Sequence, residues 1–417
     1  MYDILLCLVS LIALPKLLYQ MAFHKKYRNS LKQRLGIGFP EIEKGNKKLI
    51  WVHAVSMGEA KAVAALAREL KKRSDNDAIL LFSTVTETGL AEGEKELPEA
   101  DYHVFLPLDF SWIIRPIIRR VRPDQVIVCE TDYWYNFLSS SKNAGARLSV
   151  VNGKISERSM HRLLKFPKFT KRLFCLIDKF CVQSHHYRER FLKLGIPEEK
   201  IAITGNIKFD NSFPKLTEEE LVEWKSKFGI RPEDHVLVAG STHDPEERII
   251  LDACFEVWKD DPHLKILIVP RHPERFNEVA QLLKKRGVKF SRYSEGVSHE
   301  APVILVDAMG VLLQCYQAAT LAIVAGSFTP KVGGHNIVEP CWYGVPVLFG
   351  PYLYSQPELL ELVQEYGAGV QVEPEHLSDE IKGLLSEPKR RKALGAAGIH
   401  LADSLQGATE RTLVEIA

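Results

Sequence analysis

The chain has 417 residues, of which 46% are hydrophobic and 26% charged, and its formal net charge is +2. This composition excludes a disordered chain, and the length predicts about two domains because a single core rarely grows so large. A nearly balanced charge gives no reason to expect a nucleic-acid partner. The cysteines have neither the spacing of a zinc site nor the density of a disulfide framework, so we expect free thiols in a reducing compartment.

The N-terminal segment is unlike the rest of the chain. Residues 4–14 are almost wholly apolar, Pro15 and Lys16 interrupt the run, and it resumes over residues 17–23. A secretory signal would carry its positive charge first, whereas here the basic residues follow the apolar run. The uninterrupted part is shorter than the roughly 20 residues of a membrane-spanning helix. We therefore expect a helix that lies in the cytoplasmic leaflet of a membrane, with a core helix of the first domain or a single span as alternatives.

A cluster of basic residues follows this apolar segment, and we expect its side chains to contact anionic headgroups. The residues are His24, Lys25, Lys26, Arg28, Lys32 and Arg34.

From residue 47 onward, short apolar runs alternate with amphipathic stretches at the spacing of βαβ units. In the first half this pattern predicts strands at residues 49–53, 78–82, 102–106, 125–129, 148–151 and 179–182, and helices that include residues 57–72, 111–120 and 185–194. A polar linker with a proline follows at residues 211–217.

The same alternation restarts after the linker. It predicts strands at residues 236–239, 265–269, 303–306, 321–325 and 346–349. Helices are expected at residues 245–258, 277–286, 309–318, 356–366 and 377–385, with a further helix that begins near residue 338. The chain is therefore predicted to be an α/β protein with two similar halves.

Candidate functional residues follow the predicted strands, because parallel sheets bind ligands at the carboxyl ends of their strands. In the first half this edge carries Glu59, Glu130 and Lys208, and in the second half it carries Arg271 and the stretch from Asp307 to Gly310. The first half thus offers carboxylates, and the second offers cations and glycines. This asymmetry suggests an anionic ligand on the second domain and a proton-accepting site on the first.

The stretch from Gly326 to Pro340 follows a predicted strand and precedes a helix start. Gly333 and Gly334 would let the backbone approach a ligand closely, and Asn336 is a plausible N-cap for a helix whose free amides point at an anion. The same residues could instead form a tight turn with a capping residue. Both interpretations stay open on the glycine pattern alone.

The residues of the first half also have purely structural interpretations. Ser56 and Glu59 have the spacing of a capping box, and a helix N-terminus should lower the pKa of Glu59 and weaken it as a base. Glu130 and Asp132 could be a solvated loop pair, and Lys208 could be a surface charge. In the second half, Arg271 and Arg275 suit either an anion or a structural salt bridge.

Taken together, several motifs resemble the 3-deoxy-D-manno-octulosonic acid (Kdo) transferases of lipopolysaccharide synthesis. They occur in the family's order along nearly the whole chain. The motifs are His53 to Glu59, Glu130 to Trp134, Gly205 to Asp210, Pro270 to Arg275 and Gly333 to Pro340.

The resemblance implies a GT-B fold, in which two Rossmann-like domains face each other across a cleft, with an N-terminal apolar membrane-associated helix. The implied domains are a membrane-associated segment (1–36), an acceptor domain (37–210), a CMP-sugar donor domain (211–400) and a C-terminal helix (401–417) that could cross back to the first domain. The implied enzyme transfers Kdo from CMP-Kdo to a lipid A precursor at the cytoplasmic face of the inner membrane. It inverts the anomeric centre and needs neither a metal nor a cofactor.

Carried over position by position, the resemblance makes Glu59 the general base and assigns Glu130 and Lys208 to stabilising the transition state. Two positions depart from the family's usual pattern, which often has an acidic residue in place of Val311 and a proline in place of Ile337. The residues implied in CMP binding are Arg271, His272, Met309, Gly310, Val311, Asn336, Ile337, Val338 and Glu339.

Two other functions would use the same architecture. A UDP-sugar transferase or epimerase shares the fold and would differ in the nucleotide that it binds. A non-catalytic sugar-nucleotide sensor would leave Glu59, Glu130 and Lys208 without a task.

Overall fold

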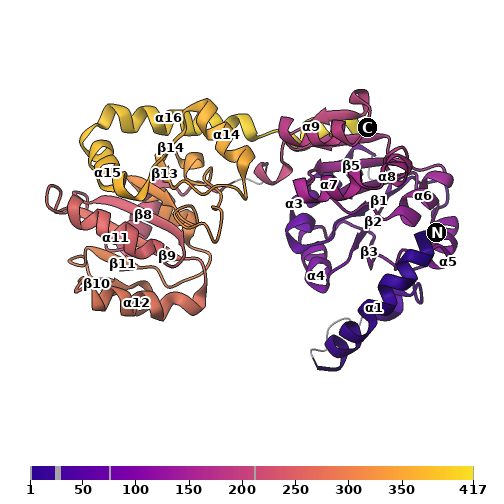
Figure 1. Cartoon of the computed structure of the whole chain (residues 1–417), viewed down its shortest axis with the longest axis horizontal. Coiled ribbons are helices and arrows are strands. Elements are labelled where there is room, and N and C mark those ends of the chain that lie inside the picture. The colour runs from indigo at the N-terminus through magenta and orange to yellow at the C-terminus, as the bar shows by residue number, and fades with distance from the viewer. Residues whose placement is uncertain (1, 24–29, 75–76, 211–212, 417) are drawn as a thin grey trace. The chain divides into compact units, whose positions relative to one another are not determined.

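The computed structural model describes residues 2–23, 30–74, 77–210 and 213–416, which form two compact units (Figure 1). The first unit comprises residues 1–211 and 405–417, and the second comprises residues 212–404. Residues 211 and 212, where the linker was expected to begin, lie outside the described residues.

The first unit is built on a parallel sheet of seven strands in the order β3-β2-β1-β4-β5-β6-β7. Its strands are β1 (Leu49–His53), β2 (Ile79–Thr84), β3 (Tyr102–Phe105), β4 (Gln125–Cys129), β5 (Arg147–Gly153), β6 (Lys179–Val182) and β7 (Ile201–Ile203). Its helices are α1 (Tyr2–Phe23), α2 (Leu31–Arg34), α3 (Met57–Arg73), α4 (Glu87–Glu96), α5 (Ser111–Val121), α6 (Tyr135–Asn143), α7 (Glu157–Leu164), α8 (Pro167–Phe174), α9 (His185–Lys193) and α17 (Ala408–Ile416), with short 3₁₀ turns η1 (Glu198–Lys200) and η2 (Ile207–Phe209).

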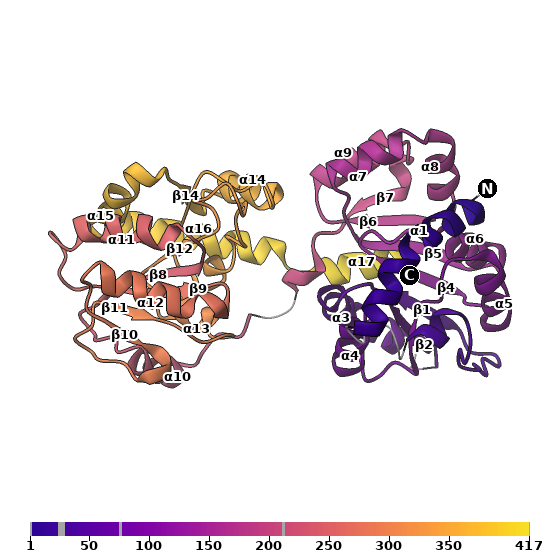
Figure 2. The ribbon, with the colours of Figure 1, turned by 60° about the horizontal axis from the view of Figure 1, so that its bottom comes forward.

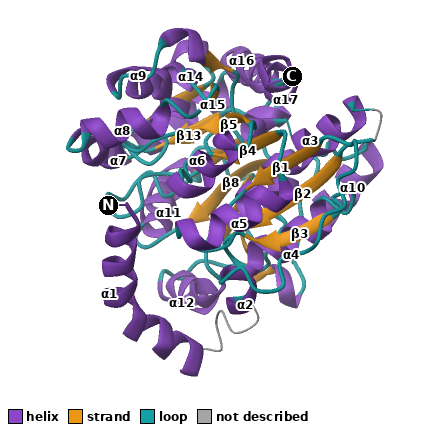
Figure 3. Cartoon of the chain, turned by 90° about the vertical axis from the view of Figure 1, so that its right-hand side faces the viewer, coloured by secondary structure: helices purple, strands orange, loops and turns teal. Residues whose placement is uncertain are grey.

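Helices cover both faces of this sheet, which explains why its strands are continuous apolar runs (Figure 3). Along β1, Leu49 and Trp51 pack into one core with residues of α5 and α6. Ile50 and Val52 pack into a second core with residues of α3 and α17. Successive side chains of a strand point to opposite faces, so one short strand serves both cores.

The C-terminal helix α17 belongs to the first unit although it follows the second unit in sequence. Leu413 and Ile416 are buried in the same core as α3, and Asp210 accepts a hydrogen bond from the amide of Ala408 at 3.1 Å. Figure 2 shows α17 in yellow beside the strands of the first unit.

The second unit repeats the architecture with a parallel sheet of seven strands in the order β10-β11-β9-β8-β12-β13-β14. Its strands are β8 (His235–Thr242), β9 (Leu264–Pro270), β10 (Phe290–Arg292), β11 (Val303–Leu305), β12 (Leu321–Val324), β13 (Val347–Phe349) and β14 (Gly369–Gln371). Its helices are α10 (Glu218–Lys227), α11 (Glu246–Val257), α12 (Phe276–Lys285), α13 (Leu312–Gln317), α14 (Pro357–Tyr366), α15 (Leu377–Ser386) and α16 (Pro388–Leu405), with 3₁₀ turns η3 (Pro273–Arg275), η4 (Tyr293–Glu295), η5 (Pro340–Tyr343) and η6 (Pro374–His376).

The N-terminal apolar segment forms the single helix α1, which continues through Pro15 (Figure 1). Its first turn is fastened to the first unit, because the Tyr2 hydroxyl donates to Asp109 Oδ2 at 2.9 Å and Asp3 Oδ1 accepts from the Ser111 amide at 3.0 Å. Between Ile4 and Leu14 most of its apolar side chains are exposed, with Ile12 81% exposed. No helix in the described part of the chain is both long and apolar enough to span a membrane.

One residue of the basic cluster is placed differently from our expectation. Arg34 is buried, donates through Nε to Ser30 Oγ at 3.0 Å and lies over the ring of Phe105 at 5.2 Å. The expectation that Arg34 contacts headgroups is therefore wrong, because its guanidinium is buried and contacts Ser30 and Phe105 inside the first unit. His24, Lys25, Lys26 and Arg28 lie outside the described residues.

Most predicted strands are confirmed, and β1, β4 and β6 have the predicted bounds. The edge strands β10 and β14 were not predicted, because their partly exposed residues form no apolar run. The predicted helix at 309–318 begins only at Leu312. The helix expected near residue 338 is instead the single 3₁₀ turn Pro340–Tyr343.

Candidate active site

The strand order of the first sheet reverses between β1 and β4, and ligands of such sheets bind outside the carboxyl ends of the strands at this point. Glu130 directly follows β4, and Glu59 lies in the first turn of α3, which follows β1. The predicted residues of the first unit therefore gather at the position where the topology favours a site.

Glu59 is held at the start of α3 by a local hydrogen-bond network. Its Oε2 accepts from the amide of Val55 at 2.8 Å and its Oε1 accepts from Ser56 Oγ at 3.1 Å, while Ser56 Oγ accepts from the Glu59 amide at 3.4 Å. Ser56 therefore caps α3 as expected, but the reciprocal half of a capping box is absent here, because Glu59 accepts from the amide of Val55 rather than from that of Ser56. The side chain is still half-buried and keeps free acceptor capacity.

The pKa of Glu59 is raised, which corrects the expectation that the helix N-terminus lowers it. Burial is the largest cause, and the charge of Glu130 also raises the pKa, against the lowering effect of the hydrogen bond from Val55. Desolvation outweighs the local dipole, so Glu59 is a stronger base than its position in the helix suggested.

Glu130 is a buried carboxylate held by two ammonium groups. Its Oε1 accepts from Lys208 Nζ at 2.8 Å and from Asn152 Nδ2 at 3.2 Å, and its Oε2 pairs with Lys154 Nζ at 2.7 Å. Burial acts to raise the pKa of Glu130, but the two lysines lower it by more, and the net pKa lies below the ordinary value. Glu130 is therefore a fixed anion rather than a solvated loop residue, and Lys208 is not merely a surface charge.

The backbone of Glu130 adopts a left-handed conformation, with φ of 62°. Such a conformation is uncommon for a residue other than glycine and carries a strain cost, which is often found at functional sites. The turn after β4 thus carries a conformational strain, and its conformation places the Glu130 carboxylate in contact with Lys154 and Lys208.

Lys154 and Asn152 were not among the predicted site residues, and Asp132 was expected only as part of a loop pair. Asn152 and Lys154 lie at the carboxyl end of β5, so the rule that selected Glu130 could have found them. Asp132 lies near enough to Glu59 to feel its charge. Burial, followed by the charge of Glu59, raises the pKa of Asp132 to about 6.

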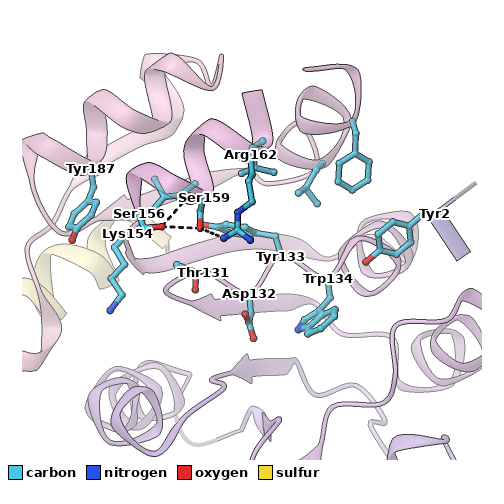
Figure 4. Close-up of a pocket in the computed structure, with 14 residues that line it drawn as sticks. Tyr2, Thr131, Asp132, Tyr133, Trp134, Lys154, Ser156, Ser159, Arg162 and Tyr187 are labelled. Atoms are coloured by element: carbon cyan, nitrogen blue, oxygen red, sulfur yellow. Dashed lines mark hydrogen bonds between the residues drawn. The ribbon is translucent and has the colours of Figure 1, made fainter. Parts of the chain in front are cut away.

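Asp132 and Lys154 also line a cavity of about 790 Å³ in the first unit (Figure 4). Its walls come from the loop after β4, from α7 and α8, and from Tyr2 of α1. The lining residues are Tyr2, Thr131, Asp132, Tyr133, Trp134, Lys154, Ile155, Ser156, Ser159, Arg162, Leu163, Phe169, Leu173 and Tyr187.

The second unit carries a smaller cavity of about 280 Å³ near the carboxyl ends of β8 and β9. Four of the predicted CMP-binding residues line it, namely Arg271, Met309, Gly310 and Glu339, and Ser241 joins them from the end of β8. Because β8 and β12 are the neighbours between which this sheet reverses its order, the cavity lies close to the switch point of the second sheet.

Arg271 and Glu339 influence each other in this cavity. Burial raises the pKa of Glu339 to about 7, against the lowering effect of the Arg271 charge and of a hydrogen bond from Asn336. Arg271 is exposed, and no ion pair of its guanidinium occurs within the described residues. Arg275 is different, because its guanidinium forms a bidentate pair with buried Glu247 at 2.6 and 3.1 Å. Of the two roles considered for Arg275, the structure therefore shows the structural salt bridge.

His272 stands apart from the lining residues of this cavity and packs against His243, with ring centroids 5.3 Å apart. His243 in turn shares a hydrogen bond with His335, at 2.8 Å between the two Nε2 atoms. Burial and then the charge of His243 lower the pKa of His335 to about 4, so this ring is neutral at neutral pH.

The remaining predicted CMP-binding residues contribute differently from one another. The side chains of Ile337 and Val338 are fully buried, so only their backbone is available to a ligand. Asn336 Oδ1 accepts from the amide of Val338 at 3.1 Å, as a turn-capping residue would. Val311 precedes α13 and is half-buried.

At Gly333 and Gly334 the space that a side chain would occupy is filled by the chain itself. Both residues have φ of 86°, and an added Cβ would lie 2.5 Å from the ring of Tyr354 and 2.3 Å from Leu353. The glycines therefore admit the chain's own segment at residues 352–354, and close approach of a ligand to their backbone stays a prediction. The four-residue turn η5 likewise replaces the helix whose dipole was expected to hold an anion.

Among the residues that the structure describes, there is no group of three or more histidine, cysteine, aspartate or glutamate side chains placed to hold a metal ion.

Comparison with known proteins places the chain in a family. Residues 29–211 match the family described as 3-deoxy-D-manno-octulosonic-acid transferase (kdotransferase). The chain is 37% identical to the 3-deoxy-D-manno-octulosonic acid transferase of Chlamydia muridarum over 396 residues, which cover 94% of this chain and 91% of that protein. The corresponding transferase of Haemophilus influenzae is 32% identical over 422 residues, which cover 98% of this chain and 94% of that protein.

Solved structures with similar folds include a glycosyltransferase from Rickettsia africae, with a TM-score of 0.62, 18% identity and coverage of 89% of this chain and 98% of that one. The UDP-GlcNAc 2-epimerase of Neisseria meningitidis has a TM-score of 0.60, 16% identity and coverage of 88% and 99%. At such low identity these likenesses show the fold alone, in which two parallel sheets of seven strands match GT-B enzymes. The similarity to the transferases extends over nearly the full chain, so this protein is a glycosyltransferase that belongs to the 3-deoxy-D-manno-octulosonic acid (Kdo) transferase family.

Proposed function

We propose that the protein transfers Kdo from CMP-Kdo to a lipid A precursor, lipid IVA, in lipopolysaccharide biosynthesis, with inversion of the anomeric centre and without a metal ion. The observation that carries this proposal is the position of Glu59 and Glu130, which follow the two strands between which the first sheet reverses its order. Membership of the Kdo transferase family supports the donor and the lipid acceptor.

In the proposed reaction Glu59 is the general base. Its carboxylate accepts the proton of an acceptor hydroxyl as that oxygen attacks the anomeric carbon of Kdo. The bond from this carbon to the phosphate oxygen breaks, and CMP leaves with the electron pair. The raised pKa of Glu59 supports this role, because a more basic carboxylate takes the proton more readily.

Charges that are fixed before the reaction would stabilise its transition state. Glu130 holds the ammonium group of Lys208 at 2.8 Å, so this cation is oriented without reorganisation during transfer. In the second unit, the exposed guanidinium of Arg271 suits the phosphate of CMP, and the small cavity beside it suits the nucleotide. These two cations would supply the counter-charge that a metal supplies in other enzymes.

We further propose that the protein works at the cytoplasmic face of the inner membrane. The exposed apolar side chains of α1 support this location, since a helix of this kind can bury them among acyl chains. A lipid acceptor that resides in the same membrane would then reach the enzyme without leaving the bilayer.

The function is tested by incubating the protein with CMP-Kdo and lipid IVA and following the lipid product by mass spectrometry. We expect the lipid to gain the mass of Kdo residues, and we expect EDTA not to reduce the amount of this product. The fold is shared with UDP-sugar enzymes, so competition of CMP against UDP for the purified protein separates the two nucleotide classes. Preference for UDP, or no product from CMP-Kdo, would refute the proposal.

A further inference from the structure

The 790 Å³ cavity of the first unit is the larger of the two cavities described above, and its two ends differ in chemistry. One end is aromatic and aliphatic, with Tyr2, Trp134 and Phe169 among its walls. The other end is more polar, with Lys154, Ser156 and Ser159 beside Tyr187. Figure 4 shows Arg162 between the polar side and the aromatic end, with Trp134 and Tyr2 beyond it. A ligand that fills this cavity must therefore be amphipathic.

Arg162 is the cation of this cavity that is left for a ligand. Its only hydrogen bond seen within the described residues goes to Ser159 Oγ at 3.2 Å, and Ser159 Oγ also accepts from Ser156 Oγ at 2.9 Å. Lys154, the other cation, is paired with Glu130 at 2.7 Å. A guanidinium with free donors beside two hydroxyls is well suited to a phosphate group.

Tyr2 makes the N-terminal helix part of the cavity. Its ring stacks on Phe169 with centroids 5.8 Å apart and planes 13° apart, and its hydroxyl donates to buried Asp109. Asp3 accepts from Asn136 Nδ2 at 2.7 Å, so the first turn of α1 is fixed against α6. The exposed apolar side chains of α1 begin at Ile4, directly after this anchored turn.

We propose that this cavity is the lipid subsite for the acceptor, in which Arg162 binds a phosphate of the acceptor and the aromatic wall of Tyr2, Trp134 and Phe169 holds the first part of an acyl chain. The inference rests on the proposed function and adds the residues that select the acceptor. Asp132, which lines the same cavity and feels the charge of Glu59, places the subsite beside the proposed base. The rest of the acyl chain would run past Tyr2 along the apolar surface of α1. That helix then takes part in substrate recognition as well as in membrane attachment.

The test compares Arg162→Gln and Phe169→Ala with matched controls outside the cavity. Lys168→Gln removes an exposed cation of α8, and Phe166→Ala removes a 65% exposed ring three residues before Phe169. The acceptors are a tetra-acylated glucosamine disaccharide bisphosphate, its dephosphorylated form and its de-acylated form. Transfer kinetics and acceptor binding in mixed micelles are both measured.

We expect Arg162→Gln to raise KM and Kd for the phosphorylated acceptor about tenfold, because one charge-assisted contact is lost. Both values should stay unchanged for the dephosphorylated acceptor. Phe169→Ala should raise KM and Kd for the acylated acceptors about tenfold and leave both values unchanged for the de-acylated acceptor. Both controls should behave like the wild type, and kcat should change little in every variant.

If Arg162→Gln weakens binding of the phosphorylated and dephosphorylated acceptors equally, Arg162 does not bind the phosphate. If the variants and the controls lose the same acceptor affinity, the cavity is not the acceptor subsite. A wild type that binds these acceptors with the expected selectivity but forms no product from CMP-Kdo would refute the proposed function and leave the subsite standing. Normal transfer by the wild type, with all variants unchanged, would refute the subsite alone.

Discussion

Glu130 shows how a single residue couples strain, burial and charge. Its carboxylate is 4% exposed and accepts from both Lys154 and Lys208, and its backbone is left-handed. Removing the charge would leave two ammonium groups facing each other without their shared anion. The free energy of this arrangement therefore resides in the cluster rather than in any one pair.

Glu130→Gln is expected to lower the free energy of unfolding by about 1–3 kcal/mol, because the loss of a buried hydrogen-bonded charge is much more costly than the loss of a surface pair. The matched control is Glu198→Gln, which removes the exposed partner of Arg188 and should cost less than about 1 kcal/mol. The midpoints of urea unfolding give both values. Equal losses in the two variants would show that the Glu130 cluster contributes no more than a surface ion pair.

Asp132 should make acceptor binding depend on pH. Its pKa is about 6, so it becomes negatively charged as the pH rises through that value and then repels an anionic acceptor. Affinity for the bisphosphorylated acceptor should therefore fall between about pH 5 and pH 7, in addition to any change from the ligand's own titration. In Asp132→Asn this part of the decline should disappear, as measured by binding in mixed micelles. Superimposable profiles for wild type and variant would contradict the assignment.

At the scale of elements, the loop around Gly334 is set by packing within the second unit. Gly334→Ala combines positive φ with a Cβ placed 2.3 Å from Leu353, whereas Gly287→Ala has φ of 68° and no atom within 4 Å of the new Cβ. We expect Gly287→Ala to cost about 1 kcal/mol and Gly334→Ala to cost clearly more, because only the second must also displace a neighbour. The comparison is made on the thermal unfolding midpoints. Equal shifts of the midpoint in the two variants would show that Leu353 moves aside at no cost in stability.

Helix α1 can be tested without disturbing its anchored first turn. Replacing exposed Leu8 and Ile12 by glutamate keeps Tyr2 and Asp3 and adds charge to the surface expected to enter the membrane. Binding to vesicles that contain anionic lipid should fall at least about tenfold, because the apolar contribution is lost and anions are repelled. Val222→Glu, on an exposed side chain of α10, is the control. Undiminished vesicle binding by the double variant would exclude α1 as the attachment surface.

At the scale of the whole molecule, the sequence predicted most of the interior strands and the edge of each sheet at which the candidate residues lie. Strands such as β4 are apolar on both faces, and a continuous apolar run is visible without coordinates. Edge strands β10 and β14 are partly exposed and carry polar residues or glycine, so no run marks them.

The candidate site residues were predicted from their positions after the strands, either directly, as for Glu130, or a few residues later, as for Glu59 and Lys208. Lys154, the partner of Glu130, also directly follows a strand, but the strand was predicted to end at residue 151, whereas β5 continues to Gly153. The raised pKa of Glu59 could not be predicted, because it depends on burial by residues distant in sequence. The true neighbours of Gly333 and Gly334 likewise come from residues 352–354, which no local pattern connects to them.

The most direct test of the account is Glu59→Gln, assayed for Kdo transfer from CMP-Kdo and, in parallel, for CMP affinity. Loss of the base should reduce kcat by at least about 100-fold, while CMP, which is assigned to the second unit, should bind as it does to the wild type. Transfer at more than a tenth of the wild-type rate by a variant with normal CMP affinity would contradict the central claim that Glu59 removes the acceptor's proton.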